Sequence, residues 1–137
     1  DQYSSDLFTD IETLLQTSDF ISLHLPLNEN THEILGSDEI HNMKVGATLI
    51  NTARGGLVNE PALISALRSG HLRGAGLDVF AEEPLADGHP LFSLDNVILS
   101  PHVAYNTPDA VKAIFEITVR NICRYFDGEP INIVAAP

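Results

Sequence analysis

The sequence is poor in cysteine, methionine and tryptophan, with a single cysteine (Cys123), a single methionine and no tryptophan. One cysteine cannot form an internal disulfide, and it argues against a cysteine-based metal site. None of the six histidines is paired with carboxylates at a metal-ligand spacing. We therefore expect a protein without a bound metal, in a reducing, cytoplasmic location.

Basic residues are also few, because 7 Lys and Arg stand against 19 Asp and Glu, giving a formal net charge of −12. Such a chain repels nucleic-acid backbones and anionic lipid surfaces. No apolar stretch approaches the ~18 to 20 residues of a membrane span, and the first residues lack the pattern of a secretory signal. We expect a soluble protein that binds neither nucleic acid nor membranes.

The overall amino-acid composition is that of a globular protein. The chain has 137 residues, of which 44% are hydrophobic and 19% charged. At this length folding buries roughly two thirds of the surface of the unfolded chain, which sustains an apolar core without disulfides or metals. The sequence thus predicts one folded unit of ordinary domain size.

Short apolar runs alternate along the chain with segments of helical periodicity. The apolar runs predict strands over residues 20–25, 45–50, 74–80 and 96–100. Helices are predicted over residues 10–16, 37–43, 60–69 and 108–127. This alternation predicts an open, doubly wound parallel α/β sheet of the Rossmann-like type, in which the first strand is buried on both faces.

Local signals mark where the helices begin. Thr9 and Glu12 have the spacing of a capping box, and Asn59 precedes a first turn that contains a proline. Thr107 precedes Pro108 in the same way. The apolar stripe of the helix that follows is expected to pack in a core or a domain interface, with Cys123 buried in it.

Polar side chains lie at the ends of all four predicted strands. His24 closes the first strand, Arg54 follows the second, Asp78 lies near the end of the third with Glu83 in the next loop, and His102 follows the fourth. In an open parallel sheet, ligands bind at the carboxyl ends of the strands. We therefore expect these five side chains to surround a site.

The residue types indicate which chemistry the site supports. Arg54 can bind a carboxylate through two parallel hydrogen bonds. His102 can exchange a proton near neutral pH, and a neighbouring Glu83 would favour its protonated form and orient its ring. These three groups suffice to interconvert a hydroxy acid and a keto acid if a cofactor carries the hydride.

Each of these residues also has a plainer interpretation. His24 fits an ordinary strand-end residue bonded to backbone, Arg54 a surface ion-pair partner, Asp78 a loop cap and His102 a turn residue. Chemistry alone does not choose between Glu83 and its neighbour Glu82. The remaining histidines, which are His32, His41, His71 and His89, are expected to be solvated.

Four motifs carry a resemblance to a known family. They lie at residues 23–27, 49–58, 76–84 and 100–102, and include the run Asn-Thr-Ala-Arg-Gly-Gly at 51–56. Together they resemble the D-isomer-specific 2-hydroxyacid dehydrogenases over nearly the whole chain. The resemblance implies that Arg54 binds the substrate carboxylate, that His102 is the acid/base and that Glu83 is its partner.

The same resemblance implies NAD as the cofactor and assigns residues to it. Leu25 and Pro26 would pack near the adenosine half, and Asp78 would face the nicotinamide. The other implied cofactor contacts are Thr52, Ala53, Arg54, His102 and Ala104. Tyr105 stands where family members often have a small residue, so it would shape the substrate pocket.

The family's Gly-x-Gly-x-x-Gly turn, which binds the pyrophosphate, does not occur in the sequence. We therefore expect the C-terminal portion of a dinucleotide-binding domain over residues 1–127, with its closing helix, and a tail over 128–137. The first strands of the sheet would be absent. Asp1 is a candidate for the carboxylate that binds the adenosine ribose.

The resulting hypothesis is an NAD-dependent oxidoreductase that interconverts a D-2-hydroxy acid and its 2-keto acid. Its partners would be a small 2-hydroxy or 2-keto acid and a second copy of the whole protein. The alternative is a non-catalytic, NAD(H)-sensing binding protein or corepressor that keeps the dehydrogenase fold. Turnover of a keto acid by the whole protein separates the two.

Overall fold

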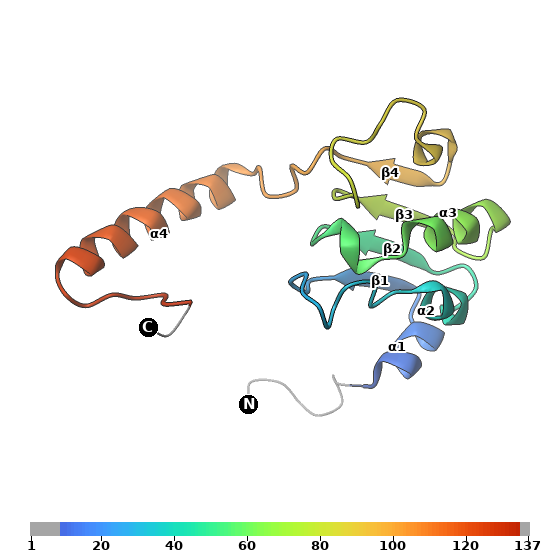
Figure 1. The fold of residues 1–137 in the computed structure, drawn as a ribbon, viewed down its shortest axis with the longest axis horizontal. Coiled ribbons are helices and arrows are strands. Elements are labelled where there is room, and N and C mark those ends of the chain that lie inside the picture. The colour runs from blue at the N-terminus through green and yellow to red at the C-terminus, as the bar shows by residue number, and fades with distance from the viewer. Residues whose placement is uncertain (1–8, 135–137) are drawn as a thin grey trace. The chain divides into compact units, whose positions relative to one another are not determined.

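The computed structural model describes residues 9–134, so Asp1, the candidate ribose-binding residue, lies outside the described part. The chain divides into two compact units, Asp1–His102 and Val103–Pro137. The first unit carries the sheet and the second carries one long helix (Figure 1).

The first unit is a parallel four-stranded sheet in the order β1-β2-β3-β4. Its strands are β1 (Phe20–Leu23), β2 (Thr48–Asn51), β3 (Gly74–Leu77) and β4 (Val97–Leu99). Its α-helices are α1 (Ile11–Thr17), α2 (Ser37–Asn42) and α3 (Glu60–Ser69). Two short 3-10 helices, η2 (Gly55–Leu57) and η3 (Pro90–Ser93), lie in the loops. All four predicted strands are confirmed, each shorter than its apolar run.

The predicted helix caps are confirmed except at the start of α1. The side chain of Asn59 accepts the backbone N–H of Ala62 at 3.0 Å, and Gly70 ends α3 in the left-handed conformation that glycine tolerates. At α1 the N-cap is Asp10 rather than Thr9, because the Asp10 carboxylate accepts the backbone N–H of Thr13 at 2.8 Å. A carboxylate at this position also interacts favourably with the helix dipole.

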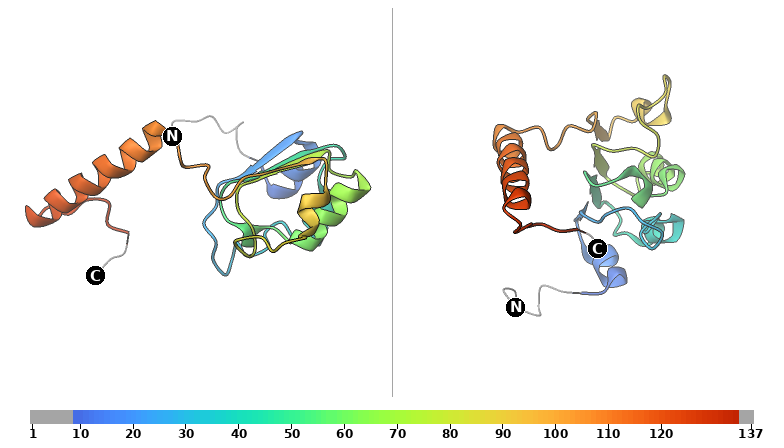
Figure 2. Two further views of the ribbon diagram at one scale, coloured as in Figure 1. Left: turned by 90° about the horizontal axis from the view of Figure 1, so that it is seen from above. Right: turned by 60° about the vertical axis from the view of Figure 1, so that its left-hand side comes forward.

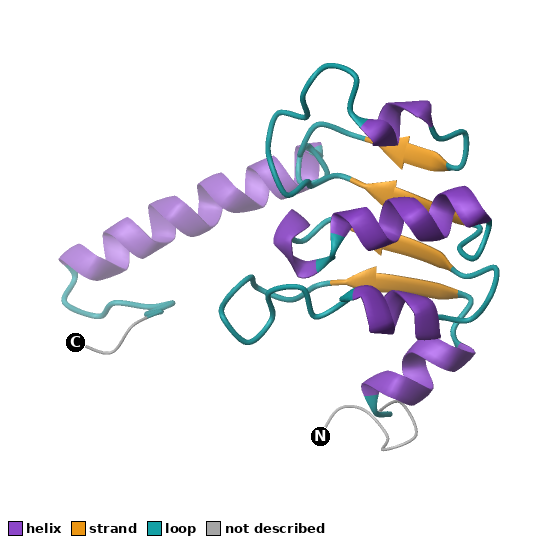
Figure 3. Cartoon of the chain, turned by 45° about the vertical axis from the view of Figure 1, so that its right-hand side comes forward, coloured by secondary structure: helices purple, strands orange, loops and turns teal. Residues whose placement is uncertain are grey.

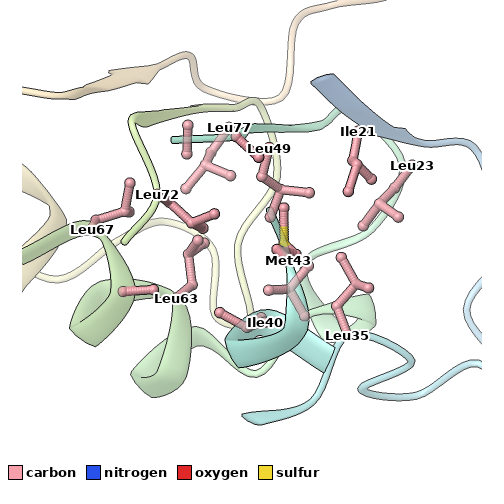
Figure 4. Packing of buried hydrophobic residues seen from close by; sticks show 14 of the residues in the cluster. Ile21, Leu23, Leu35, Ile40, Met43, Leu49, Leu63, Leu67, Leu72 and Leu77 are labelled. Carbon is pink, nitrogen blue, oxygen red and sulfur yellow. The ribbon is translucent and has the colours of Figure 1, made fainter. Parts of the chain in front are cut away.

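The core lies between the sheet and the helices, which cover one face of it (Figures 2 and 3). Leu49, Leu57 and Leu72 are fully buried there, and leucines from α3 pack beneath the strands (Figure 4). Side chains along β1 alternate between exposed and buried. The prediction that β1 is buried on both faces is therefore wrong, since the helices of this unit contact only one face.

The opposite face of the sheet carries exposed apolar side chains. Phe20 on the edge strand β1 is 69% exposed and Ile98 on β4 is 78% exposed. The strand register aligns Ser22, Ile50, Gly76 and Ile98 in one row across this face.

We expect the 137-residue chain by itself to self-associate through this edge and face. Phe20→Gln should lower its apparent mass in light scattering, because a polar side chain reduces the apolar area that association removes from water. Val45→Gln is the matched control, since Val45 is 74% exposed but lies outside the strands. Equal masses for the two variants would contradict the prediction.

Helix α4 (Pro108–Phe126) forms the second unit, and its N-terminus is capped by Thr107, whose Oγ1 accepts the N–H of Ala110 at 3.2 Å. No residue of α4 is buried and Cys123 is exposed. The apolar stripe and Cys123 are thus uncovered within the described residues, and packing of the stripe in a core or a domain interface stays a prediction. Within the described part of this unit, residues 103–134, no second helix or strand is present to cover the stripe. Among residues 9–134, no helix is both long enough and apolar enough to cross a membrane.

Candidate active site

The carboxyl ends of the four parallel strands meet at one edge of the sheet, where the chain leaves Leu23, Asn51, Leu77 and Leu99. His24, Arg54, Asp78 and His102 follow these ends within three residues. The structure thus places a predicted site residue beyond every strand.

The side chains of His102 and Glu83 are joined by a direct hydrogen bond. The His102 Nδ1 lies 2.8 Å from Glu83 Oε2, and the other carboxylate oxygen, Oε1, accepts the backbone N–H of Phe80 at 3.0 Å. Geometry thus selects Glu83 as the carboxylate on His102. Because both oxygens of Glu83 are bound, the carboxylate holds the imidazole in one orientation.

The backbone of His102 is left-handed, with φ of 56°, directly after the proline that follows β4. Its N–H donates to the carbonyl of Ser100 at 3.1 Å, which closes a tight turn. This conformation is uncommon for a residue with a side chain, and such outliers cluster at functional sites.

The pKa of Glu83 is lowered below its ordinary value, first by the hydrogen bond with His102 and then by the N–H of Phe80. Both interactions favour the charged carboxylate. Glu83 therefore stays ionised through the neutral range and supplies a fixed negative charge beside the imidazole.

Glu83→Gln in the whole protein should lower the unfolding temperature near neutral pH by no more than a few degrees. Glu83 and His102 are 36% and 43% exposed, and an ion pair this exposed contributes at most about 1 kcal/mol. A lowered folded-state pKa means that the ionised carboxylate stabilises the fold above its unfolded pKa, a contribution lost as pH falls through the folded value. Thermal unfolding followed from neutral to acid pH should show the difference vanish in acid. A difference that persists in acid would assign the effect to packing.

Arg54 lies in the turn after β2. Its guanidinium donates from Nη1 to the carbonyl of Ala53 at 2.5 Å. The ion pairs formed within residues 9–134 do not include it, so the described structure leaves its charge available to an anion. The interpretation of Arg54 as a surface ion-pair partner therefore finds no support.

A cleft of about 440 Å³ separates the loops after β1 and β2. It is lined by His24, Leu25, Pro26, Leu27, Thr52, Ala53 and Arg54. The five residues predicted to contact the cofactor from these two loops therefore lie around one cleft. His24 joins them, with its Nε2 bonded to Ser22 Oγ at 2.9 Å rather than to backbone.

A second cleft, of about 540 Å³, contains the Glu83-His102 pair. Glu83 and His102 line it together with apolar side chains from the loop before β4, among them Leu85 and Phe92. Arg54 therefore opens on one cleft and His102 on another. Ala104, a predicted cofactor contact, belongs to the second unit and stays a prediction.

Asp78 is 3% exposed at the end of β3, and its Oδ1 accepts the hydroxyl of Ser100 at 2.5 Å. This bond joins the end of β3 to the residue that begins the Ser100-Pro101-His102 turn. The sequence hypothesis did not select Ser100 as a site residue. A hydroxyl directly after a strand was the available signal, but only the structure shows its partner.

Asn51 is a second residue that the sequence hypothesis did not select. It is 2% exposed, and its amide binds the Ala53 N–H and the Arg54 carbonyl. The available signal was a polar residue at the end of an apolar run.

His89 is also not solvated as expected. Its Nε2 lies 3.1 Å from Glu60 Oε1 at the start of α3, and its side chain is 19% exposed. The contact anchors the loop that carries Glu83 onto α3.

A parallel Rossmann-like sheet with a His-Glu pair and an arginine beyond its strand ends is typical of nucleotide-dependent oxidoreductases. The comparisons with known proteins make the family specific. Residues 1–104 match the NAD binding domain of the D-isomer specific 2-hydroxyacid dehydrogenases, and the chain belongs to that family.

Individual relatives agree with this assignment. The chain is 45% identical to a glyoxylate reductase of Thermofilum pendens over 122 residues, which are 89% of this chain and 36% of that protein. It is 44% identical to a glycerate dehydrogenase of Methylorubrum extorquens over 138 residues, covering 99% of this chain and 44% of that protein. D-lactate dehydrogenase of Lactobacillus jensenii, solved with NAD+, superposes with a TM-score of 0.85 at 34% identity, over 98% of this chain and 46% of that chain. The chain thus spans less than half the length of these relatives.

Proposed function

We propose that the whole protein is an NAD-dependent oxidoreductase that interconverts a D-2-hydroxy acid and its 2-keto acid. The observation that carries the proposal is the bonded His102-Glu83 pair, which lies beyond the strand ends of a chain from this dehydrogenase family. Arg54, whose charge no described carboxylate neutralises, supplies the complementary group for an acid substrate.

The cleft between the loops after β1 and β2 fits the cofactor. Leu25 and Pro26 offer exposed apolar surface for a base, and the Thr52–Arg54 turn offers backbone groups and a positive charge for the more polar part. When bound, the nicotinamide supplies the hydride or takes it up. This chain's own residues then have to bind the acid and move the proton.

His102 is the proton carrier in this proposal. Its Nδ1 is bonded to Glu83, so Nε2 is the ring nitrogen that faces the substrate. In reduction, the proton leaves Nε2 for the carbonyl oxygen as the hydride reaches the carbon, and Glu83 balances the charge of the imidazolium before transfer. In oxidation, Nε2 accepts the hydroxyl proton.

Arg54 selects and orients the substrate. A planar guanidinium binds a carboxylate through two hydrogen bonds, which hold the neighbouring carbonyl in one position. Relatives named glyoxylate reductase and glyoxylate/hydroxypyruvate reductase B make glyoxylate and hydroxypyruvate the first 2-keto acids to test.

The experiment is the keto-acid-dependent loss of NADH absorbance by the whole protein. Turnover of any small 2-keto acid would support the proposal. NADH binding without turnover across a broad panel would overturn it and favour a non-catalytic NAD(H)-sensing protein. Light scattering on the same sample measures whether the whole protein is the expected homodimer.

A further inference from the structure

The proposed reaction needs Arg54 and His102 to act on one small substrate, yet the two residues follow different strands and line different clefts. A carboxylate and the adjacent carbonyl of a 2-keto acid are separated by one bond. The relative position of the two side chains therefore has to be held closely, since a displacement of about 1 Å can cost 10²-fold in rate.

Asn51 holds one side of this arrangement. Its side chain is 2% exposed, Nδ2 donates to the Arg54 carbonyl at 2.9 Å, and Oδ1 accepts the Ala53 N–H at 3.0 Å. Both ends of a buried amide are thus bonded to the turn that carries Arg54. The Asn51 carbonyl accepts the N–H of Asp78 at 3.0 Å, which joins this turn to the end of β3.

Gly55 is the point where the Arg54 turn touches the loop that carries Glu83. A Cβ placed on Gly55 would lie 2.0 Å from the carbonyl carbon and oxygen of Phe80 and 2.5 Å from the nitrogen of Ala81. Real side chains do not approach backbone this closely, and backbone cannot move aside as the end of a side chain can. Glycine is therefore required here for space.

Phe80 in turn is bonded to the acid/base pair. Its N–H donates to Glu83 Oε1 at 3.0 Å, and Glu83 Oε2 holds His102 Nδ1 at 2.8 Å. A continuous path of contacts thus runs from the Arg54 turn through Gly55 and Phe80 to Glu83 and His102.

We infer that Asn51 and Gly55 are positioning residues that hold Arg54 in register with the Glu83-His102 pair. Asn51 sets the conformation of the Arg54 turn, and the bare backbone of Gly55 sets the separation between that turn and the Glu83 loop. The inference rests on the proposed function, because register matters only if both groups meet one substrate.

Gly55→Ala in the whole protein is the first test. The methyl group pushes the two loops apart, so kcat/KM for the 2-keto acid should fall about 10- to 100-fold. The pKa of Glu83, measured from its carboxyl carbon by NMR, should rise toward its ordinary value as the Phe80 N–H moves away. Gly36→Ala is the matched control, because its methyl meets the end of the Glu39 side chain at 2.9 Å instead of rigid backbone.

Asn51→Leu is the second variant and disturbs only the Arg54 side. Its apolar side chain has a similar size but can neither accept the Ala53 N–H nor donate to the Arg54 carbonyl. We expect KM for the keto acid to rise more than kcat falls, while the pKa of Glu83 stays at the wild-type value. This variant keeps the inference testable if Gly55→Ala fails to fold.

The outcomes separate the inference from the proposed function. If both variants retain wild-type turnover and the pKa of Glu83 is unchanged, the inference is wrong while the proposed function stands. Equal fractional losses of kcat/KM and of folded protein would assign a merely structural role to both residues and also overturn it. If the wild type turns over no keto acid, the proposed function fails, and the register of two groups on one substrate fails with it. The Glu83 titration of Gly55→Ala then still shows whether Gly55 supports the Glu83 loop.

Discussion

His102→Asn in the whole protein is expected to lower kcat for keto-acid reduction by about 10²- to 10⁴-fold, the range that a positioned general acid contributes. Asparagine is chosen because His102 has a left-handed backbone, with φ of 56°, which asparagine adopts more readily than most residues. The substitution therefore removes the titrating group while the turn is retained.

Affinity for NADH provides the internal check on this variant, because neither the Leu25-Pro26 surface nor the Thr52–Arg54 turn is altered. Since His102 is itself an implied cofactor contact, we expect calorimetric titration to show a loss of NADH affinity far smaller than the loss of kcat, below about tenfold or ~1.4 kcal/mol. His41→Asn on the remote helix α2 is the matched control and should leave kcat unchanged. A His102→Asn enzyme with full kcat would assign the proton transfer to another group.

Local sequence signals predicted the order of the strands and α-helices in the first unit but not its two 3-10 helices, because caps, glycines and apolar runs act within a few residues. Asn59 and Gly70 bound α3 as expected. The exposure of Phe20 was not predictable in the same way, since the apolar run at 20–25 suits burial on both faces. Whether a strand face is buried depends on what packs against it, and the helices of the first unit contact only one face.

The candidate site was predictable to the extent that it depends on strand ends. The topology brings His102 and Glu83 to one edge of the sheet. The two residues are 19 positions apart in the sequence, and no periodic pattern predicts the 2.8 Å hydrogen bond between them. The contacts of Gly55 with Phe80 and of Ser100 with Asp78 are of the same kind. They arise from distances between loops that only the folded chain sets, so the sequence hypothesis named Arg54, Glu83 and His102 but did not select the residues that contact their loops.

Arg54→Gln is expected to lower kcat/KM for the keto acid by about 10²- to 10³-fold, and Arg54→Lys by a smaller factor that is still several-fold. Hydrogen bonds to charged groups contribute roughly 1.5 to 3 kcal/mol each, and glutamine removes the charge along with the bidentate geometry. Lysine keeps the charge but offers a single point of contact. Comparison of kcat/KM among the enzymes with Arg, Lys and Gln at position 54 therefore separates the contribution of geometry from that of charge.

The comparison of two substrates shows whether Arg54 acts on the carboxylate in particular. In the Arg54 variants the carboxylate of a 2-keto acid loses the guanidinium that binds it. The corresponding methyl ester has no such charge and should be a poor substrate for the wild type and both variants alike. The discrimination between acid and ester, measured as the ratio of their kcat/KM values, should therefore collapse in Arg54→Gln. A variant that keeps the wild-type ratio would show that the carboxylate is bound elsewhere, and Arg54 would then be left as a residue of the cofactor cleft.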